Sequence, residues 1–357
     1  MLHWGSFFGR PNGNFDVETK PVAITLPGPV AEVGSSNSSE YALLKDGRLY
    51  AWGLGNDGQL GNGKQRDSFR QAVQVSFPAG VRIAWIPTDA MPYNTGLAVD
   101  TKGNVWGWGK NNFGQLCTRR TEILTPTRLP VGAVSALAGA SNHVLYDSHG
   151  TVYTCGQNID GDLGDGKWVN SAKPRKVAGL SGTTAVGVYA SFANSGVLLS
   201  TGQYYDWGYN DAGQLGNGKT KRSNVPVLVH LPSPVTSVAL GGSIWDNGQT
   251  IVKLSDGSMW AWGNDKAGQL GDARMIRSLV PTRFTPPKGV TYAMLATGSA
   301  TSYAITRAGL VYAWGISHVG QVGNASTDGT FVPVLVARGA TGISSTANNV
   351  VINTPDD

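Results

Sequence analysis

Two short stretches of the sequence have the residue types and spacing of phosphate-binding loops. Residues 213–220 read GQLGNGKT, which fits G-x-x-x-x-G-K-[ST], and residues 53–58 read GLGNDG, which fits G-x-G-x-x-G. Such loops bind phosphates through backbone N–H groups between a buried strand and the start of a helix. After Thr220 the chain reads KRSNVPVLVHLPSPV, whose prolines and β-branched residues disfavour a helix. We therefore expect neither stretch to bind a nucleotide.

Other candidate chemistry is equally weak at the sequence level. Residues 158–166 read NIDGDLGDG, which suggests a calcium loop but lacks the glycine at the sixth position and the closing glutamate. The histidines, at positions 3, 143, 149, 230 and 318, show no spacing typical of a metal site. The sequence predicts no cofactor, no metal and no catalytic constellation.

A repeat explains both phosphate-loop matches. The dipeptide Trp-Gly recurs, Cys155-Gly156 takes its place once, and most copies precede a variant of the phrase GNDGQLGNGK. The loop at 213–220 is one copy of this phrase that happens to end in Lys-Thr. Regular recurrence of this kind indicates a repeat architecture. The repeated positions are Trp4, Trp52, Trp108, Cys155, Trp207, Trp262 and Trp314.

Each repeat has the pattern of four short strands. In residues 235–285 the segments VTSVAL, TIVKL, SMWAWG and LVPTRF are apolar or alternating, and Asp-Gly turns the chain at 256–257. A four-stranded sheet buries little surface by itself, so several sheets arranged radially are expected, which is a propeller. The C-terminal VVINTPDD followed by the N-terminal MLHWG reads like the middle of one repeat, which predicts a sheet that both ends share.

Composition agrees with a β-rich chain. Of 357 residues, 49 are glycine and only 14% are charged, and the net charge of +5 favours anionic partners. No apolar run is long enough to span a membrane, and the first residues show no secretion signal. The two cysteines, Cys117 and Cys155, lie in consecutive repeats. We expect them to be small buried hydrophobic side chains, with a disulfide as the alternative.

The phrases YALLKDGRLYAWGLGNDGQLGNG (41–63) and SYAITRAGLVYAWGISHVGQVGN (302–324) resemble the repeat of the regulator of chromosome condensation family. The resemblance covers essentially the whole chain. It implies an all-β, seven-bladed β-propeller of four-stranded antiparallel blades, closed by a clasp of N- and C-terminal strands. The expected domain is a single propeller over residues 1–357, with residues 1–29 and about 336–357 sharing one blade.

The family resemblance is less specific about function. Relatives include a nucleotide exchange factor for a small GTPase, a plant ultraviolet-B photoreceptor and bacterial propellers that inhibit β-lactamases. The Gly-Trp-Arg-His-Thr phrase of the photoreceptor does not occur here, so ultraviolet sensing is not expected. The inhibitors bind through loop side chains on one rim, and that mode remains open for this chain.

The alternating strand directions predict that two sets of loops emerge on one face. An inner rim would carry aromatic and polar side chains, and an outer belt would carry cations. The rim candidates are Tyr93, Asn94, His143, Tyr189, Phe192, Asn194, Trp245, Asp246 and Asn247. The belt candidates are Arg66, Arg119, Arg120, Lys219, Lys221 and Arg222.

These features favour a rigid protein-binding propeller whose rim inserts into a partner and whose belt orients the approach. The partner would be another protein, of acidic character. Nucleic acid and membrane are not expected, and a monomer is. The alternative is an enzyme or small-ligand binder at the central mouth, using Glu40, His143 and Asp246. Low charge and many small polar residues favour a secreted protein, while a cytoplasmic one stays open.

Overall fold

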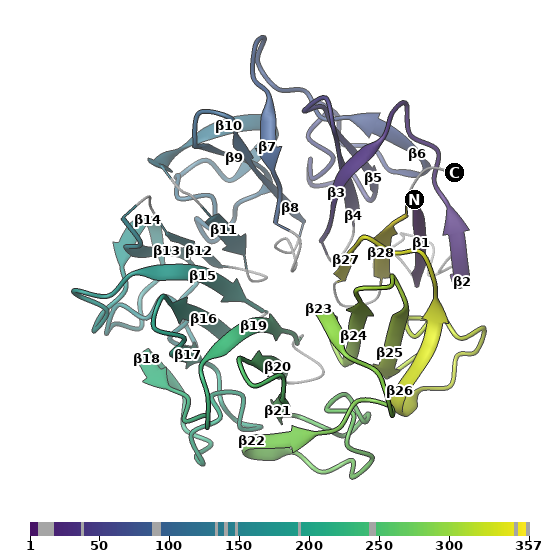
Figure 1. The fold of residues 1–357 in the computed structure, drawn as a ribbon. Helices are drawn as coiled ribbons and strands as arrows, with labels where there is room; N and C mark the ends of the chain where they lie inside the picture. The colour runs from purple at the N-terminus through teal and green to yellow at the C-terminus, as the bar shows by residue number, and fades with distance from the viewer. Residues whose placement is uncertain are drawn as a thin grey trace.

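The computed structural model describes residues 1–5, 18–36, 39–87, 94–132, 135–138, 142–146, 149–191, 194–242, 248–345 and 349–354. These residues form strands and turns and no helix, and their sheets lie radially around a central axis (Figure 1). The prediction of an all-β propeller is therefore confirmed. No described helix is long and apolar enough to cross a membrane.

The predicted blade count needs correction, because only six blades are formed by four consecutive strands. The remaining four-stranded sheet, here called the composite sheet, takes two strands from each end of the chain in the order β2-β1-β28-β27. Its strands are β27 (Gly342–Ser345), β28 (Asn349–Asn353), β1 (Leu2–Gly5) and β2 (Glu18–Ala23).

The six continuous blades are numbered in chain order. Blade 1 holds β3 (Val30–Ser35), β4 (Ser39–Leu44), β5 (Leu49–Gly53) and β6 (Ser68–Gln74); blade 2 holds β7 (Ile83–Trp85), β8 (Thr95–Asp100), β9 (Asn104–Lys110) and β10 (Glu122–Gly132). Blade 3 holds β11 (Ser135–Ala138), β12 (Asn142–Tyr146), β13 (Val152–Gly156) and β14 (Ser171–Lys176); blade 4 holds β15 (Ala185–Ala190), β16 (Asn194–Leu199), β17 (Tyr204–Gly208) and β18 (Ser223–Leu228). Blade 5 holds β19 (Val235–Leu240), β20 (Gln249–Leu254), β21 (Met259–Gly263) and β22 (Ser278–Phe284); blade 6 holds β23 (Tyr292–Thr297), β24 (Thr301–Thr306), β25 (Val311–Gly315) and β26 (Thr330–Ala337).

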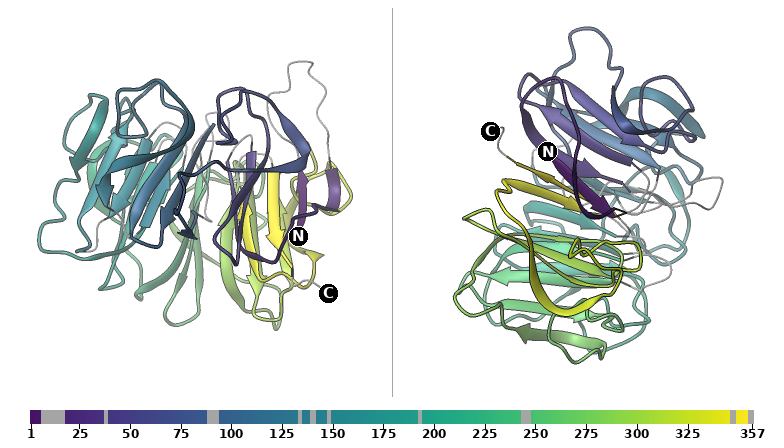
Figure 2. Two further views of the ribbon diagram at one scale, coloured as in Figure 1. Left: turned by 90° about the horizontal axis from the view of Figure 1, so that it is seen from above. Right: turned by 90° about the vertical axis from the view of Figure 1, so that its right-hand side faces the viewer.

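The composite sheet joins the two ends of the chain by backbone pairing. β1 is antiparallel to β28, with Leu2 opposite Ile352 and Trp4 opposite Val350. β27 contacts β23 of blade 6 on one side and β3 of blade 1 on the other. Side views show the first strand, in purple, beside the last strand, in yellow (Figure 2). The sheet therefore lies between the first and last continuous blades.

In five of the sheets, the buried tryptophan of the third strand connects the sheet to the preceding blade. Its indole ring covers the second glycine of the G-Q-L-G loop of the preceding blade, where a Cβ would clash with the ring. The indole N–H donates a hydrogen bond to the backbone carbonyl of the residue two positions before that glycine. The pairs are Gly61 with Trp108, Gly164 with Trp207, Gly216 with Trp262, Gly271 with Trp314, and Gly323 with Trp4. The repeated phrase is thus a packing device between blades.

This arrangement also accounts for the phosphate-loop match. Gly216 has a φ of 59°, and a Cβ there would lie 2.9 Å from Nε1 of Trp262. After Lys219 and Thr220 the chain continues into strand β18, and no helix follows. The space that a phosphate would need beside the glycine is filled by an indole ring, so the prediction that this stretch is a repeat loop is confirmed.

Candidate functional site

The ends of the two predicted loop sets come close together at two places that the structure describes. Asn94, at the start of β8, donates from Nδ2 to Asp57 in the loop between β5 and β6. In blade 5, Asn264 N donates to Gly248 O at 2.9 Å, which brings together the ends of the corresponding two loops. The Asp-Gly turns lie at the opposite end of the strands, where Arg82 Nη1 donates to Asp46 O at 2.7 Å.

Most of the predicted inner rim cannot be located. Tyr93, Phe192, Trp245, Asp246 and Asn247 lie outside the described residues. His143 lies on β12 opposite Cys155 in the pairing register, and only its backbone is described. The rim candidates whose side chains the structure does describe are Asn94, Tyr189 and Asn194.

Two of these described candidates have structural roles. Asn194 is buried at the start of β16, and its Nδ2 donates to Tyr209 O at 2.6 Å. Thr301 starts β24 in the same way, with its hydroxyl donating to Ile316 O at 2.9 Å. Tyr189 lies on β15, half-buried, with its ring in edge contact with Tyr204 at a centroid distance of 6.0 Å. Both side chains thus make contacts within the propeller, and their part in a binding rim stays a prediction.

Glu40, predicted for the alternative site at the central mouth, makes contacts within the propeller. Its side chain is fully buried on β4, where Oε2 accepts a hydrogen bond from Trp52 Nε1 at 2.7 Å and lies 3.6 Å from His3 Nδ1. Glu40 thus supplies for Trp52 the acceptor that a backbone carbonyl supplies for the other blade tryptophans. Asp246 and the side chain of His143 lie outside the described residues, so the alternative site of Glu40, His143 and Asp246 stays a prediction.

Metal-binding chemistry finds no support in the part of the chain that the structure covers. No group of three or more His, Cys, Asp or Glu side chains gathers there with the geometry to hold an ion. Asp162, in the stretch that resembled a calcium loop, is buried, and burial raises its pKa well above the usual range. A carboxyl that favours its neutral form in this way is a poor ligand for a hard cation.

The outer loops are held by buried asparagines at equivalent positions. Asn210 accepts from Leu215 N at 2.9 Å and donates to the carbonyls of Lys219 at 2.9 Å and Lys221 at 3.0 Å. Asn111 and Asn158 make the corresponding contacts in blades 2 and 3. One buried amide therefore fixes the backbone of each of these three loops, while the basic belt side chains remain exposed.

The belt cations differ in how they are paired. Arg222 contacts Asp160 and lies 3.8 Å from Asp211, and its guanidinium stacks 4.7 Å above the ring of Tyr209. This arginine is therefore neutralised within the propeller. The other belt candidates are exposed and form no ion pair with any described residue: Arg66, Arg119, Arg120, Lys219 and Lys221.

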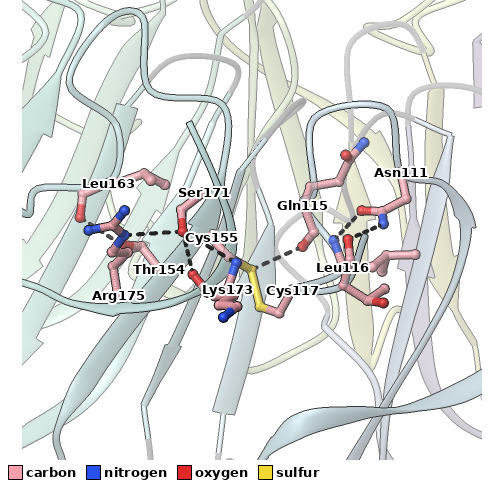
Figure 3. Close-up of a disulfide and its surroundings, with 11 residues drawn as sticks. Asn111, Gln115, Leu116, Cys117, Thr154, Cys155, Leu163, Ser171, Lys173 and Arg175 are labelled. Carbon is pink, nitrogen blue, oxygen red and sulfur yellow. Dashed lines mark hydrogen bonds between the residues drawn. A yellow bond between two sulfur atoms is a disulfide. The ribbon is translucent and has the colours of Figure 1, made fainter. Parts of the chain in front are cut away.

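The two cysteines form a disulfide between blades 2 and 3 (Figure 3). Cys117 and Cys155 are both buried, as expected, but they are bonded, with their Cα atoms 5.4 Å apart. Cys155 takes the position of the blade tryptophan, and Cys117 takes the position of the glycine beneath it. Sγ of Cys155 lies 3.3 Å from Gln115 O, the acceptor that an indole would use.

Sequence reasoning missed a set of exposed apolar side chains in the loops that follow β9 and β13. Phe113, Ile159, Trp168 and Val169 are 41%, 59%, 50% and 63% exposed. The sequence did distinguish these residues from those of the neighbouring repeat. At the positions of Ile159, Trp168 and Val169 in blade 3, blade 4 carries the polar residues Asp211, Thr220 and Lys221. The repeat itself does not require apolar residues at these positions.

Comparison with protein families finds two matching models, both described as the regulator of chromosome condensation (RCC1) repeat. The first matches residues 46–87, 149–192, 201–244 and 256–305, and the second matches residues 93–115. Together the first four segments cover about half of the chain.

Individual relatives differ widely in size and role. The chain is 29% identical over 292 residues to the human E3 ubiquitin-protein ligase HERC2, covering 79% of this chain but only 6% of HERC2. It is 28% identical over 356 residues to the ultraviolet-B receptor UVR8 of Arabidopsis thaliana, covering 96% and 79% of the two chains.

Among solved structures, Prp20p from Saccharomyces cerevisiae superposes with a TM-score of 0.83 at 19% identity, covering 100% of this chain and 92% of Prp20p. Human WBSCR16 also superposes with a TM-score of 0.83 at 19% identity, covering 98% and 97%. At this level of identity the similarity shows a shared fold. Prp20p is described as binding Gsp1p and histones, and a further structure shows it with Kap60.

Proposed function

This chain belongs to the regulator of chromosome condensation (RCC1) repeat family, and we propose that it is a rigid propeller that binds another protein through its loop-bearing face. The observation that carries the proposal is the set of exposed belt cations without a carboxylate partner among the described residues, represented by Arg66, Lys219 and Lys221. Unpaired cations on one face attract an acidic partner and orient its approach.

The fold supports the same proposal. Prp20p, a propeller of this type, binds proteins, and the blades here are locked together by buried tryptophans that leave the loops free to vary. In the finer form of the proposal, the rim residues Tyr93, Phe192 and Trp245 insert into the partner, because aromatic side chains contribute strongly to such contacts. The belt then governs mainly the rate of association.

The experiment compares two charge-reversed variants that change the same number of charges on opposite faces. Lys219→Glu with Lys221→Glu alters the belt, and Lys45→Glu with Lys102→Glu alters exposed lysines beside the turns of the other face. Each immobilised protein captures partners from an extract of the source organism, and binding of the identified partner is then measured with purified components. We expect slower association and a weaker salt dependence for the belt variant only. Equal binding by both variants would contradict the proposal.

We further propose that the protein works in an oxidising compartment. The Cys117–Cys155 bond supports this, because disulfides persist in secreted and extracytoplasmic proteins and are rare in reducing compartments. Maleimide labelling of protein taken from its native source, before and after reduction, tests it. Full labelling without reduction would place the protein in a reducing environment.

A further inference from the structure

We propose that the junction between blades 2 and 3 is a docking surface for an acidic protein segment that carries apolar side chains. This surface, here called the junction patch, consists of Phe113, Ile159, Trp168 and Val169 with the surrounding cations. It deepens the proposed function and rests on it, because it assigns the partner's contact to one part of the loop-bearing face.

The apolar side chains of the junction patch are held in place by ordered backbone. Asn158 Nδ2 donates to Lys167 O at 3.0 Å and to Val169 O at 3.4 Å, so both residues that flank Trp168 are fixed. The backbone N–H of Asn158 donates a further hydrogen bond to Asn170 Oδ1 at 2.8 Å, which also holds the loop after Val169 in place. Ile159 directly follows Asn158. The exposed rings and methyl groups therefore belong to a preformed surface, which lowers the entropic cost of binding.

Phe113 reaches the same surface from blade 2. It precedes Gly114, and a Cβ on Gly114 would lie 2.6 Å from Cα of Ala172 at the start of β14. Three residues later the Cys117–Cys155 bond joins the two blades covalently, and Figure 3 shows Lys173 on the blade 3 side of this bond. The disulfide thus holds the parts of the junction patch contributed by blades 2 and 3 together.

The matched loop of blade 4 shows that the apolar side chains are not needed for folding. Asn210 holds Lys219 and Lys221 there through the same contacts that Asn158 makes in blade 3. Yet the residue between those two lysines is Thr220, where blade 3 has Trp168. The loop of blade 4 makes the same hydrogen bonds to its buried asparagine with a threonine at this position. The half-exposed indole of Trp168 is therefore not needed to hold the loop of blade 3. Exposed apolar groups that a fold does not require indicate a contact surface.

The charge around the junction patch selects the partner. The acids of the blade 3 loop are already engaged, since Asp165 lies 3.8 Å from Arg175 and Asp160 contacts Arg222. The exposed cations form no ion pair with the described residues; they are Arg119, Arg120, Lys167 and Lys173. An acidic segment with apolar residues satisfies both features, with carboxylates on the cations and apolar groups on Trp168 and its neighbours.

The test uses a phage-displayed library of random peptides, selected on the immobilised full chain. Enriched peptides are synthesised, and their affinities are measured against the wild type and Trp168→Thr, which reproduces the blade 4 loop. Ile276→Thr is the control, because Ile276 is 67% exposed on the blade 5 loop. We expect acidic peptides with aromatic or aliphatic residues, whose binding weakens about tenfold or more in Trp168→Thr and is unchanged in Ile276→Thr.

Other outcomes overturn this inference and are separable from failure of the proposed function. Peptides that lose binding in the Lys219→Glu and Lys221→Glu variant but not in Trp168→Thr would reject the junction patch and retain the belt. No enrichment, or enrichment of basic peptides, would reject the junction patch, while the extract experiment still decides the proposed function. Tight binding of a single-stranded DNA oligonucleotide that depends on Trp168, or dimerisation lost in Trp168→Thr, would assign the surface to nucleic acid or to a second copy instead.

Discussion

The contact between blades 4 and 5 and the contact between blades 2 and 3 solve the same packing problem in different ways. In the first, Trp262 covers Gly216, and its indole N–H donates to Gln214 O at 2.7 Å. In the second, the same two positions hold Cys155 and Cys117, joined by a disulfide. One junction relies on burial and a hydrogen bond, whereas the other relies on a covalent bond.

The difference shows that the two positions must change together. A Cβ on Gly216 would come within 2.9 Å of the indole, so a tryptophan requires a glycine beneath it. A cysteine in place of the tryptophan would leave a void above a glycine, and voids between packed elements are costly. Cys117 keeps the left-handed backbone of the glycine, with a φ of 52°, and its side chain fills part of the space. The disulfide therefore substitutes for a large aromatic contact.

The largest effect is expected from Trp262→Ala, which removes the noncovalent contact. The indole is fully buried, so its loss leaves a cavity and an unpaired acceptor, and the free energy of unfolding should fall by about 3–5 kcal/mol. Urea denaturation measures it. Trp260→Ala is the control, because Trp260 lies two residues away with its side chain only partly buried. Equal losses in the two variants would show that the contact between the blades is not what stabilises this region.

A somewhat smaller effect is expected from Cys117→Ala with Cys155→Ala. The bond joins residues separated by 38 positions, and its removal should lower the free energy of unfolding by about 2–4 kcal/mol. Dithiothreitol should lower the unfolding temperature of the wild type and leave that of the double variant unchanged. Thermal unfolding with and without dithiothreitol measures both effects.

Restoring the repeat at this junction sharpens the comparison. Cys117→Gly with Cys155→Trp recreates the Trp-on-Gly contact, so this protein should be more stable than the double alanine variant and insensitive to dithiothreitol. Cys155→Trp alone should be much less stable, because Cβ of Cys117 would collide with the ring. If the effects of the two single changes on the free energy of unfolding add up to the effect of the double change, the two positions are not coupled, contrary to what the structure indicates.

The strands were predictable because their signals are local. In residues 235–285 the four expected strands coincide with β19 to β22 within a few residues. Apolar or alternating segments mark these strands, and the Asp-Gly at 256–257 marks the turn between the second and the third. The disulfide could not be predicted in the same way, because it depends on how closely two blades approach. A readable signal did exist: the cysteines replace both partners of one repeated contact.

The functional residues were harder to predict, since a loop position in the sequence does not determine where a side chain points. Glu40 was predicted for the central mouth and Asn194 for the rim, and in the structure both side chains form hydrogen bonds within their own blades. Conversely, Trp168 was not among the predicted site residues, although comparison with Thr220 of the next repeat distinguishes it. Comparing repeats position by position therefore separates structural from variable residues better than the properties of single residues do.

The smallest effect is expected where blade 5 itself departs from the repeat. Asp265 takes the place of Asn210 and accepts from Leu270 N at 2.8 Å, but it has no amide to donate, and burial raises its pKa to about 7. Its folded form thus holds a proton that the unfolded chain releases near pH 4, so stability falls as pH rises from about 4 through about 7. Asp265→Asn should therefore raise the free energy of unfolding at pH 8, with a much smaller gain at pH 4. Urea denaturation at both pH values measures this, and Asn210→Asp should show the reverse in blade 4. An equal gain at both pH values would mean that the amide, and not the titration of Asp265, accounts for the difference.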